Sequence, residues 1–234
     1  MKIVKEFSRF AHEYNQYNVI QEEVAKALIA MIPHKSYAKI LDLGAGSGAV
    51  YKRVLEEQIA FKHFVAFDFS QEMLNLHPKD TKVSTLRADF NHTTFFSTYE
   101  HDEFELVISA SSLQWSENLD KLLQTISSLA KEQYFAFFTS KTFTTLHRTA
   151  GISSPIYSKD SIIQLAQKYY HCDFSEIEYR LDFKSVQEMF TYIKHSGVSG
   201  GSGQLTFKQM KKLMKEYPLK YLEFEVLFIK AKRV

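Results

Sequence analysis

The sequence has little of what secreted, membrane-spanning or metal-dependent proteins need. Its 234 residues contain one cysteine, Cys172, so an internal disulfide cannot form, as is usual in a reducing cytoplasm. No segment approaches about 18 uncharged apolar residues, and residues 1–10 carry charges where a signal peptide would have an unbroken apolar run. The nine histidines show no metal-ligand spacing. We therefore expect a cytoplasmic protein with no membrane partner and no metal.

A strong excess of either charge is also absent. The formal net charge is +2 and charged residues make up 24% of the chain, without a long run of one sign, so wholesale disorder is not expected. The C-terminal end is more basic, because residues 203–234 contain eight basic and three acidic side chains. That end is either a solvated helix face or a surface for an acidic partner. With no strongly basic body and no Pro-Pro-aromatic turn, a nucleic-acid partner is not expected.

The hydrophobic residues that are present predict an α/β protein. They make up 45% of the chain, enough to bury a core within one domain with elaborations. Short apolar runs alternate with helical patterns from residue 38 to residue 139, which indicates βαβ crossovers and a mostly parallel sheet covered on both faces. The predicted strands are 38–43, 61–68, 83–88, 104–109 and 134–139, and the predicted helices between them are 47–58, 71–76 and 119–130.

The two ends of the chain are predicted to lie over this core. An amphipathic helix over 17–31 precedes it, and after residue 139 a helix capped by Ser158 or Asp160 runs to about residue 170. Two late strands, 174–183 and 219–230, pair antiparallel at the sheet edge, with helices over 185–195 and 206–216 between them as a lid. The Gly/Ser stretch 197–203 is either a lid hinge or an inert linker. The single domain thus divides into lid helices in 1–33, a cofactor-binding core in 36–140 and an acceptor-side region in 141–234.

A glycine-rich turn at the end of the first strand is the strongest functional signal. In Ile-Leu-Asp-Leu-Gly-Ala-Gly-Ser-Gly-Ala (40–49), Gly44, Gly46 and Gly48 permit a tight turn and close approach of a ligand to the backbone. The same turn fits the dinucleotide fingerprint in its Ala-ended form, so NAD is the alternative cofactor. Asp68, twenty residues after Gly48 at the end of the second strand, can accept both hydroxyls of a ribose. Both cofactors carry a ribose.

Three further residues favour S-adenosyl-L-methionine over NAD. Asp42 is a carboxylate at a strand end, where burial is costly unless a cation or a hydrogen-bond donor meets it, and the ammonium of this cofactor is such a group. Asp89 follows the third strand and can accept a hydrogen bond from adenine, while Phe90 offers an apolar wall. The alternative for Asp89 is a helix or turn cap.

These motifs resemble those of the class I S-adenosylmethionine-dependent methyltransferases. The acidic-glycine signature is Asp-Leu-Gly-Ala-Gly-Ser-Gly (42–48), and the second-strand signature is Asp-Phe-Ser-Gln-Glu-Met-Leu (68–74). The resemblance covers residues 36–140. It implies a Rossmann-like seven-stranded sheet with a reversed last strand and helices on both faces, and a cofactor across the carboxyl ends of the strands. It also places Ala45, Phe69 and Ser109 among the cofactor-binding residues.

The segment after the fourth strand lacks an acid or a base. Val-Ile-Ser-Ala-Ser-Ser-Leu-Gln-Trp (107–115) contains no carboxylate, histidine, lysine or cysteine. A carboxylate acceptor has an ordinary pKa of about 4 and is already ionised at neutral pH, so it needs orientation, a dry pocket and a partner charge instead of a base. The sequence therefore favours carboxyl O-methylation.

Five segments outside the core motifs resemble the malonyl-[acyl-carrier protein] O-methyltransferases of biotin synthesis, the BioC family. They are Phe-Ser-Arg-Phe-Ala-His-Glu-Tyr-Asn-Gln-Tyr (7–17), Gln-Glu-Glu-Val (21–24), Ser-Leu-Gln-Trp (112–115), Tyr-Ile-Lys-His-Ser-Gly-Val-Ser-Gly-Gly (192–201) and Tyr-Pro-Leu-Lys-Tyr (217–221). The resemblance implies methylation of the free carboxylate of malonyl-acyl carrier protein early in biotin synthesis. The chain is shorter than familiar members, and it has Ser109-Ala-Ser where many have a Ser-Asn pair.

This second resemblance assigns roles on the acceptor side. It implies that the N-terminal helix closes over the cofactor, with Tyr14 and Tyr17 at the reaction site. A malonyl carboxylate favours a bidentate cation, for which Arg148 is the first choice and Arg9 the reserve, although either could be an unpartnered surface residue. Substrate contacts are expected from Gln114, Trp115, Phe183 and His195, and contacts to the acidic carrier protein from Lys208, Lys211, Lys212 and Lys215. Two alternatives are a methyltransferase of another small carboxylic acid and a non-catalytic module that binds S-adenosylmethionine or the carrier protein.

Overall fold

The computed structural model describes residues 17–195 and 206–234, without the side chains of Lys194, His195 and Phe207. Arg9, Tyr14, the side chain of His195 and the Gly/Ser stretch 197–203 lie outside the described residues, so their assigned roles stay predictions. Within the described ranges, no helix is both long enough and apolar enough to cross a membrane.

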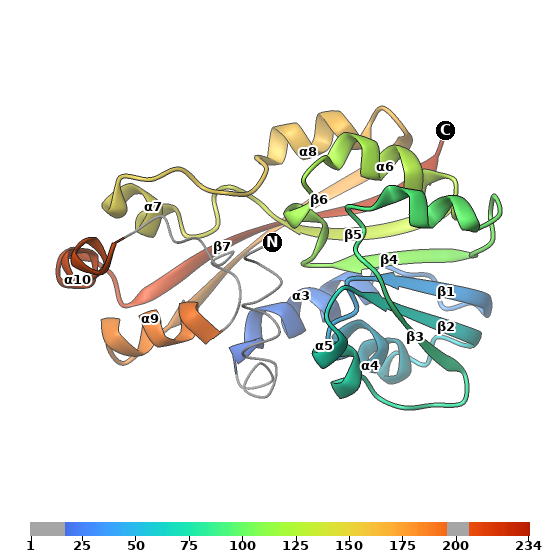
Figure 1. Cartoon of the computed structure of the whole chain (residues 1–234), viewed down its shortest axis with the longest axis horizontal. Helices are drawn as coiled ribbons and strands as arrows, with labels where there is room; N and C mark the ends of the chain where they lie inside the picture. Colours follow the sequence, from blue (N-terminus) through green and yellow to red (C-terminus); the bar gives the residue numbers. More distant parts are fainter. Residues whose placement is uncertain (1–16, 196–205) are drawn as a thin grey trace.

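Seven strands form one sheet in the order β3-β2-β1-β4-β5-β7-β6 (Figure 1). The pairs among β1 to β5 are parallel, whereas β7 is antiparallel to both β5 and β6. The predicted mostly parallel sheet with a reversed last strand is therefore confirmed. The strands are β1 (Tyr37–Leu43), β2 (Phe61–Asp68), β3 (Val83–Arg87), β4 (Leu106–Ala110), β5 (Glu132–Phe138), β6 (Tyr170–Asp182) and β7 (Tyr221–Arg233).

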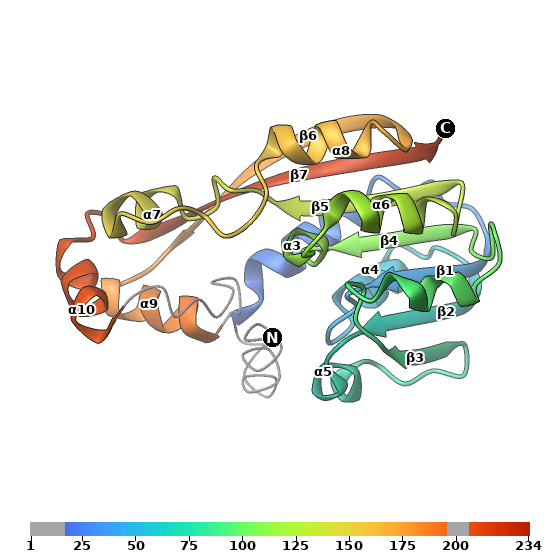
Figure 2. The same ribbon diagram turned by 45° about the horizontal axis from the view of Figure 1, so that its top comes forward.

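Helices connect these strands and cover the sheet on both faces (Figure 2). Most lie within two or three residues of the ranges expected from the apolar pattern. The α-helices are α3 (Val19–Ile29), α4 (Ala49–Glu56), α5 (Gln71–Leu76), α6 (Leu119–Ser127), α7 (Thr144–Ala150), α8 (Lys159–Ala166), α9 (Val186–His195) and α10 (Phe207–Glu216). Two short 3-10 turns are η1 (Thr93–Thr98) and η2 (Leu113–Trp115).

Alternation along the strands divides the apolar residues between two cores. In β1, Ile40 packs into the core beneath α3 and α4, whereas Leu41 faces the core beneath α6 and α8. On α3, Ile20, Val24 and Leu28 recur every four residues and are all buried, which gives this helix the single apolar face it needs to pack on the sheet. The parallel strands are thus covered on both sides, and their carboxyl ends are fixed in place.

A long hairpin of β6 and β7 carries the helices α9 and α10. Phe138, at the end of β5, pairs with Val226. Beyond that point residues 221–225 of β7 continue with β6 as their partner strand. The hairpin therefore reaches past the carboxyl ends of the parallel strands, with α9 and α10 beside it (Figure 1). The apolar pattern did not predict α7, which has seven residues, no side-chain N-cap and positive φ at both flanking residues, Phe143 and Gly151.

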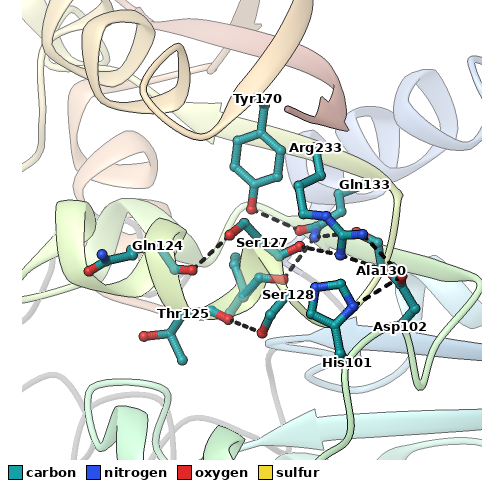
Figure 3. Close-up of polar contacts among 11 residues, drawn as sticks. His101, Asp102, Gln124, Thr125, Ser127, Ser128, Ala130, Gln133, Tyr170 and Arg233 are labelled. Carbon is teal, nitrogen blue, oxygen red and sulfur yellow. Dashed lines mark hydrogen bonds and ion pairs between the residues drawn. The ribbon is translucent and has the colours of Figure 1, made fainter.

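Ser158, one of the two predicted caps, begins α8, because its Oγ accepts the Ser161 N–H at 3.2 Å. The helix ends at Ala166, several residues before its predicted end, because residue 170 already belongs to β6. The Tyr170 hydroxyl is held inside the protein, where it donates to Gln133 Oε1 at 3.1 Å (Figure 3). Strand pairing and a buried hydrogen bond therefore override the helical pattern here.

A polar network fixes the end of the sheet opposite the glycine turn (Figure 3). Arg233, the last residue of β7, donates to both carboxylate oxygens of Asp102 at 2.8 and 3.0 Å. This bidentate pair holds the pKa of Asp102 below its ordinary value. Gln133 Nε2 donates to the carbonyls of Ile126 and Ala130, which joins β5 to the end of α6. The C-terminal strand is thereby tied to the loop that precedes β4.

Replacing Arg233 with Ala should lower the free energy of unfolding by about 2 kcal/mol, because two charge-assisted hydrogen bonds in a partly buried position are lost. Urea denaturation measures the change. Lys212→Ala is the matched control, since its pair with Glu216 spans 3.9 Å on an exposed helix face and should contribute less than about 0.5 kcal/mol. Equal losses in the two variants would contradict the role given to Arg233.

Candidate cofactor and acceptor site

A cleft opens at the carboxyl ends of β1, β2 and β4, where ligands bind in open α/β sheets. The space enclosed by its walls is about 800 Å³ when the open mouth is included. The described residues that line it are Asn18, Gln21, Ala25, Gly44, Ala45, Gly46, Ser47, Ala49, Val50, Asp68, Phe69, Met73, Phe90, Ala110, Ser111, Ser112 and Trp115.

The glycine turn forms the floor of this cleft and tolerates no side chain at two positions. Gly44 has φ +80°, and a Cβ there would lie 2.3 Å from Cβ of Ser112. Gly48 has φ +90° at the N-cap of α4, and a Cβ there would lie 2.6 Å from Cδ of Pro78. Both positions therefore need glycine for its backbone conformation and for space. The structure thus explains why glycine occupies positions 44 and 48 of the glycine-rich turn.

Two serines from the segment after β4 hold the strand end that leads into the turn. The hydroxyls of Ser109 and Ser112 lie 2.6 and 2.8 Å from the Leu43 carbonyl oxygen, and 2.7 Å from each other. The two hydroxyls have two protons for these three contacts. Since only one proton can lie between the two hydroxyls, at least one hydroxyl donates to the carbonyl. Ser109 was predicted to bind the cofactor, but it is buried, does not line the cleft and instead positions the residue before Gly44.

Asp68 lines the cleft at the end of β2. Its carboxylate accepts the Gly46 N–H at 2.9 Å and the Ser70 N–H at 2.8 Å. Burial raises its pKa to about 6, even though these hydrogen bonds act in the opposite direction. The carboxylate retains lone pairs that could accept the hydroxyls of a ribose.

Asp42 is fully buried one strand away and does not line the cleft. Neither of its carboxylate oxygens has a hydrogen-bond partner among the described residues, and burial together with Asp68 raises its pKa well above the ordinary value. A buried carboxyl group without a donor stays protonated or requires a cation nearby. This orphaned group fits a site for a cationic ligand.

Of the two residues predicted to contact adenine, Asp89 and Phe90, only Phe90 lines the cleft. Asp89 does not line it, and its Oδ1 accepts the Asn91 N–H at 2.9 Å, which closes a turn. The turn cap that the sequence left open as an alternative is therefore present, and it uses one of the two carboxylate oxygens.

On the acceptor side, an aromatic cluster joins the start of α3 to the hairpin. The ring of Tyr17 lies 6.3 Å from that of Tyr192 on α9, which in turn lies 5.3 Å from the ring of Phe183. Two predicted substrate-side residues are thus brought together around Tyr192. Neither Tyr17 nor Phe183 is among the described residues that line the cleft, although Asn18 and Gln21, close to Tyr17 in the chain, are.

No described residue that lines the cleft is a lysine, an arginine or a histidine. Arg148 lies exposed on α7, outside the described walls. Trp115 lines the cleft as predicted, but Gln114 is buried behind it, where its Nε2 donates to the Ser111 carbonyl at 2.8 Å. The structure therefore does not identify a cation for an acceptor carboxylate.

The structure also brings together three glutamates on the hairpin. The expectation of no metal rested on the spacing of the histidines, which gives no indication of this cluster. Ligand atoms of Glu176, Glu178 and Glu225 lie within 4.8 Å of one another. Lys159 pairs with Glu176 at 2.5 Å and Lys141 with Glu225 at 2.9 Å, so two of the three carboxylates have cationic partners from the chain itself.

Comparison with known proteins shows similarity to methyltransferases. A methyltransferase domain model matches residues 41–133, from β1 through the glycine turn to β5. A methyltransferase from Archaeoglobus fulgidus described as SAM-dependent superposes with a TM-score of 0.58 at 14% identity, over 91% of this chain and 94% of that one. The similarity is to methyltransferases, and the fold is that of the class I methyltransferases.

Two curated relatives are similar over almost the whole chain. The malonyl-[acyl-carrier protein] O-methyltransferase of Anoxybacillus flavithermus is 26% identical, over 94% of this chain and 89% of the relative. The protein of the same name from Neorickettsia risticii is 24% identical, over 97% of this chain and 94% of the relative. These identities are modest and do not by themselves establish a shared substrate.

The match to a methyltransferase domain favours S-adenosylmethionine over NAD as the cofactor. A Haemonchus contortus N-methyltransferase with S-adenosylhomocysteine bound superposes with a TM-score of 0.59 at 14% identity, over 98% of this chain and 60% of that one. The residues present fit this cofactor, because the glycine turn leaves space, Asp68 has free lone pairs and Asp42 is an orphaned carboxyl. Ala45, Phe69, Met73 and Phe90 could supply apolar or backbone contacts.

The sequence did not single out Ser111 and Ser112, which both line the cleft. Ser112 sets the space around Gly44, and Ser111 has a positive φ of +60°. Backbone conformation of this kind cannot be read from a serine in a sequence. The lack of charge in the segment was visible, but which of its hydroxyls faces the ligand depends on the local turn.

Gly44→Ala should abolish binding of S-adenosylmethionine, because the added methyl group overlaps Ser112 and displaces the turn. Gly151→Ala is the matched control: it has a similar positive φ of +66° but open space around a Cβ. Each variant should lose about 1 kcal/mol of stability from backbone strain. Isothermal titration calorimetry should detect binding in Gly151→Ala and none in Gly44→Ala. Intact binding in Gly44→Ala would exclude this turn as the cofactor site.

Asp68 should stabilise the ligand-free protein at about pH 4, and this contribution should be lost as the pH rises to about 6. The folded state holds the Asp68 proton more tightly than the unfolded chain, because the pKa rises from 3.8 to about 6 on folding, and Asp42 shifts in the same direction. The Asp68 shift corresponds to about 3 kcal/mol at most. Urea denaturation at pH 4.5 and pH 7 should show a smaller loss for Asp68→Asn than for the wild type. The exposed Asp160→Asn is the control, and an unchanged loss in Asp68→Asn would refute this explanation.

Proposed function

We propose that the enzyme methylates the free carboxylate of a malonyl thioester, with malonyl-acyl carrier protein as its substrate in early biotin synthesis in the cytoplasm. The observation that carries this proposal is the similarity to relatives of that name over 94% to 97% of the chain, well beyond the methyltransferase domain itself. A similarity confined to residues 41–133 would support the cofactor alone.

The chemistry of the cleft supports a carboxylate acceptor. Apart from Asp68, the described residues that line it carry no ionisable group that could act as a base. S-adenosylmethionine supplies an electrophilic methyl group on a positively charged sulfur. An ionised carboxylate can accept that methyl group without losing a proton, whereas a hydroxyl or ammonium acceptor must lose one. Apolar walls from Met73, Phe90 and Trp115 favour a transfer in which opposite charges disappear.

The proposal does not require Arg148 to contact the acceptor. This residue is exposed on α7, and α7 packs against α10 and β7 outside the described walls of the cleft. Arg148 and Arg9 stay candidates for the acceptor cation, together with the reaction-site roles of Tyr14 and Tyr17. Neutral donors in the cleft are the groups that the structure itself offers to a carboxylate.

The helix α10 presents a surface suited to an acidic carrier protein. Its four lysines at 208, 211, 212 and 215 are all exposed, while Leu213 on the opposite face is buried. Of these lysines, Lys212 has a loose pair with Glu216 at 3.9 Å. Exposed ammonium groups of this kind steer an acidic partner, and their effect weakens as salt is added.

Methyl transfer from labelled S-adenosylmethionine tests the proposal directly. We expect turnover of malonyl-acyl carrier protein, lower turnover of malonyl-coenzyme A and none of free malonate. Methylation of free dicarboxylic acids in preference to the thioesters would indicate the alternative of a small-acid methyltransferase. Cofactor binding without transfer to any acceptor would indicate a non-catalytic binding module, and either result would reject the proposed substrate.

The same assay separates the carrier protein from its acyl group. Lys211→Glu combined with Lys215→Glu should raise KM for malonyl-acyl carrier protein by about tenfold at low salt and leave KM for malonyl-pantetheine unchanged. The matched control reverses Lys230 and Lys232, two exposed lysines near the other end of β7. An equal rise in KM in the control would show that overall charge, and not the α10 surface, determines the affinity for the carrier protein.

A further inference from the structure

Ser111 has a strained backbone that its surroundings hold in place. It follows the last residue of β4 and has a φ of +60°, which is uncommon for a residue other than glycine. Its N–H donates to the Ala136 carbonyl at 2.9 Å, and its own carbonyl accepts Nε2 of Gln114 at 2.8 Å. Both backbone groups are therefore fixed from neighbouring elements, as expected where strain is retained at a functional position.

The Ser111 hydroxyl is a donor without a partner. The residue lines the cleft, and its Oγ is shielded from solvent with no hydrogen-bond partner among the residues that the structure describes. By contrast, the hydroxyls of Ser109 and Ser112 contact the Leu43 carbonyl. Buried hydroxyls are ordinarily hydrogen-bonded, so the unpaired one in a ligand cleft indicates a partner that arrives with the ligand.

Gln114 positions Ser111 and does not contact the cleft itself. Its side chain is 2% exposed, and its amide is directed by the Ser111 carbonyl. The sequence assigned Gln114 to substrate binding. The structure instead gives it an indirect role, because it holds the turn that keeps the Ser111 side chain at the cleft.

We infer that the Ser111 hydroxyl donates a hydrogen bond to the carboxylate of the acceptor and so orients it for methylation. This inference rests on the proposed carboxyl acceptor. With no cationic side chain on the described walls, a neutral donor is the group available to the anion. One carboxylate oxygen forms the new bond to the methyl carbon as the carbon–sulfur bond breaks and its electron pair stays on sulfur. The hydroxyl keeps its proton and contacts the other oxygen.

This assignment predicts an effect on acceptor binding more than on turnover. A hydrogen bond to an anionic carboxylate is stronger than one to the neutral ester that forms, so the contact stabilises the bound substrate more than the transition state. Ser111→Ala should raise KM for malonyl-acyl carrier protein about tenfold and change kcat by less than about threefold. Quenching of the fluorescence of Trp115, the single tryptophan, should report an unchanged affinity for S-adenosylmethionine.

Two further variants separate the hydroxyl from folding. Ser111→Gly also removes the hydroxyl but relieves the backbone strain, so it should be more stable than Ser111→Ala and yet raise KM equally. Ser116→Ala is the matched control, since its Oγ is also buried without a partner among the described residues but lies outside the described walls of the cleft. Gln114→Leu should raise KM in the wild type and add nothing in the Ser111→Ala background.

An unchanged KM in Ser111→Ala, or a weakened affinity for S-adenosylmethionine with the acceptor KM unchanged, would overturn the inference. A separate measurement keeps it distinct from the proposed function. Equilibrium binding of malonyl-acyl carrier protein to the complex with S-adenosylhomocysteine needs no turnover and should weaken about tenfold in Ser111→Ala. If the wild type binds the thioester but does not methylate it, the proposed function is rejected, and the binding measurement still decides the role of Ser111. If the wild type does not bind the thioester, both the proposed function and the role of Ser111 are rejected.

Discussion

The cleft depends on one buried contact between neighbouring strands, at which serine hydroxyls from the segment after β4 hold the Leu43 carbonyl at the end of β1. This carbonyl leads directly into Gly44, whose conformation leaves no room for a side chain because Ser112 occupies the adjacent space. The same segment thus fixes the floor of the cleft, and it contributes Ser111 to the wall, whose buried Oγ has no partner among the described residues. Four consecutive uncharged residues, 109–112, therefore connect the floor of the cleft to its wall.

The buried carboxyl groups of Asp42 and Asp68 oppose the stability of the ligand-free protein. Each has a pKa raised by burial, and Asp42 has no hydrogen-bond donor among the described residues. Such groups are retained where a ligand needs them, since apolar residues of similar size would pack without this cost. The energy of cofactor binding is then used partly to relieve an unfavourable arrangement that exists before the ligand arrives. The apolar cores on both faces of the sheet supply the stability that allows this arrangement.

The sequence predicted the parallel strands and the glycine turn from local patterns of apolar residues and glycine, and the reversed last strand from the resemblance to class I methyltransferases. It did not predict α7, which has no side-chain N-cap and begins after a phenylalanine with positive φ. It predicted Ser109 as a cofactor-binding residue, whereas the serines that line the cleft are Ser111 and Ser112. A sequence does not distinguish three nearby serines that differ only in backbone conformation and hydrogen bonding. It also offered Arg148 as the acceptor cation from residue type alone, whereas the position of α7 depends on packing against α10 and β7, which are distant in sequence.

The hairpin of β6 and β7 extends as a two-stranded arm past the last residue of β5, and α9 and α10 are attached to it (Figure 1). Changes of length or composition in this arm leave the register of the five parallel strands untouched. Within this architecture, evolution can therefore vary the arm while the cleft at the carboxyl ends of the parallel strands is inherited intact.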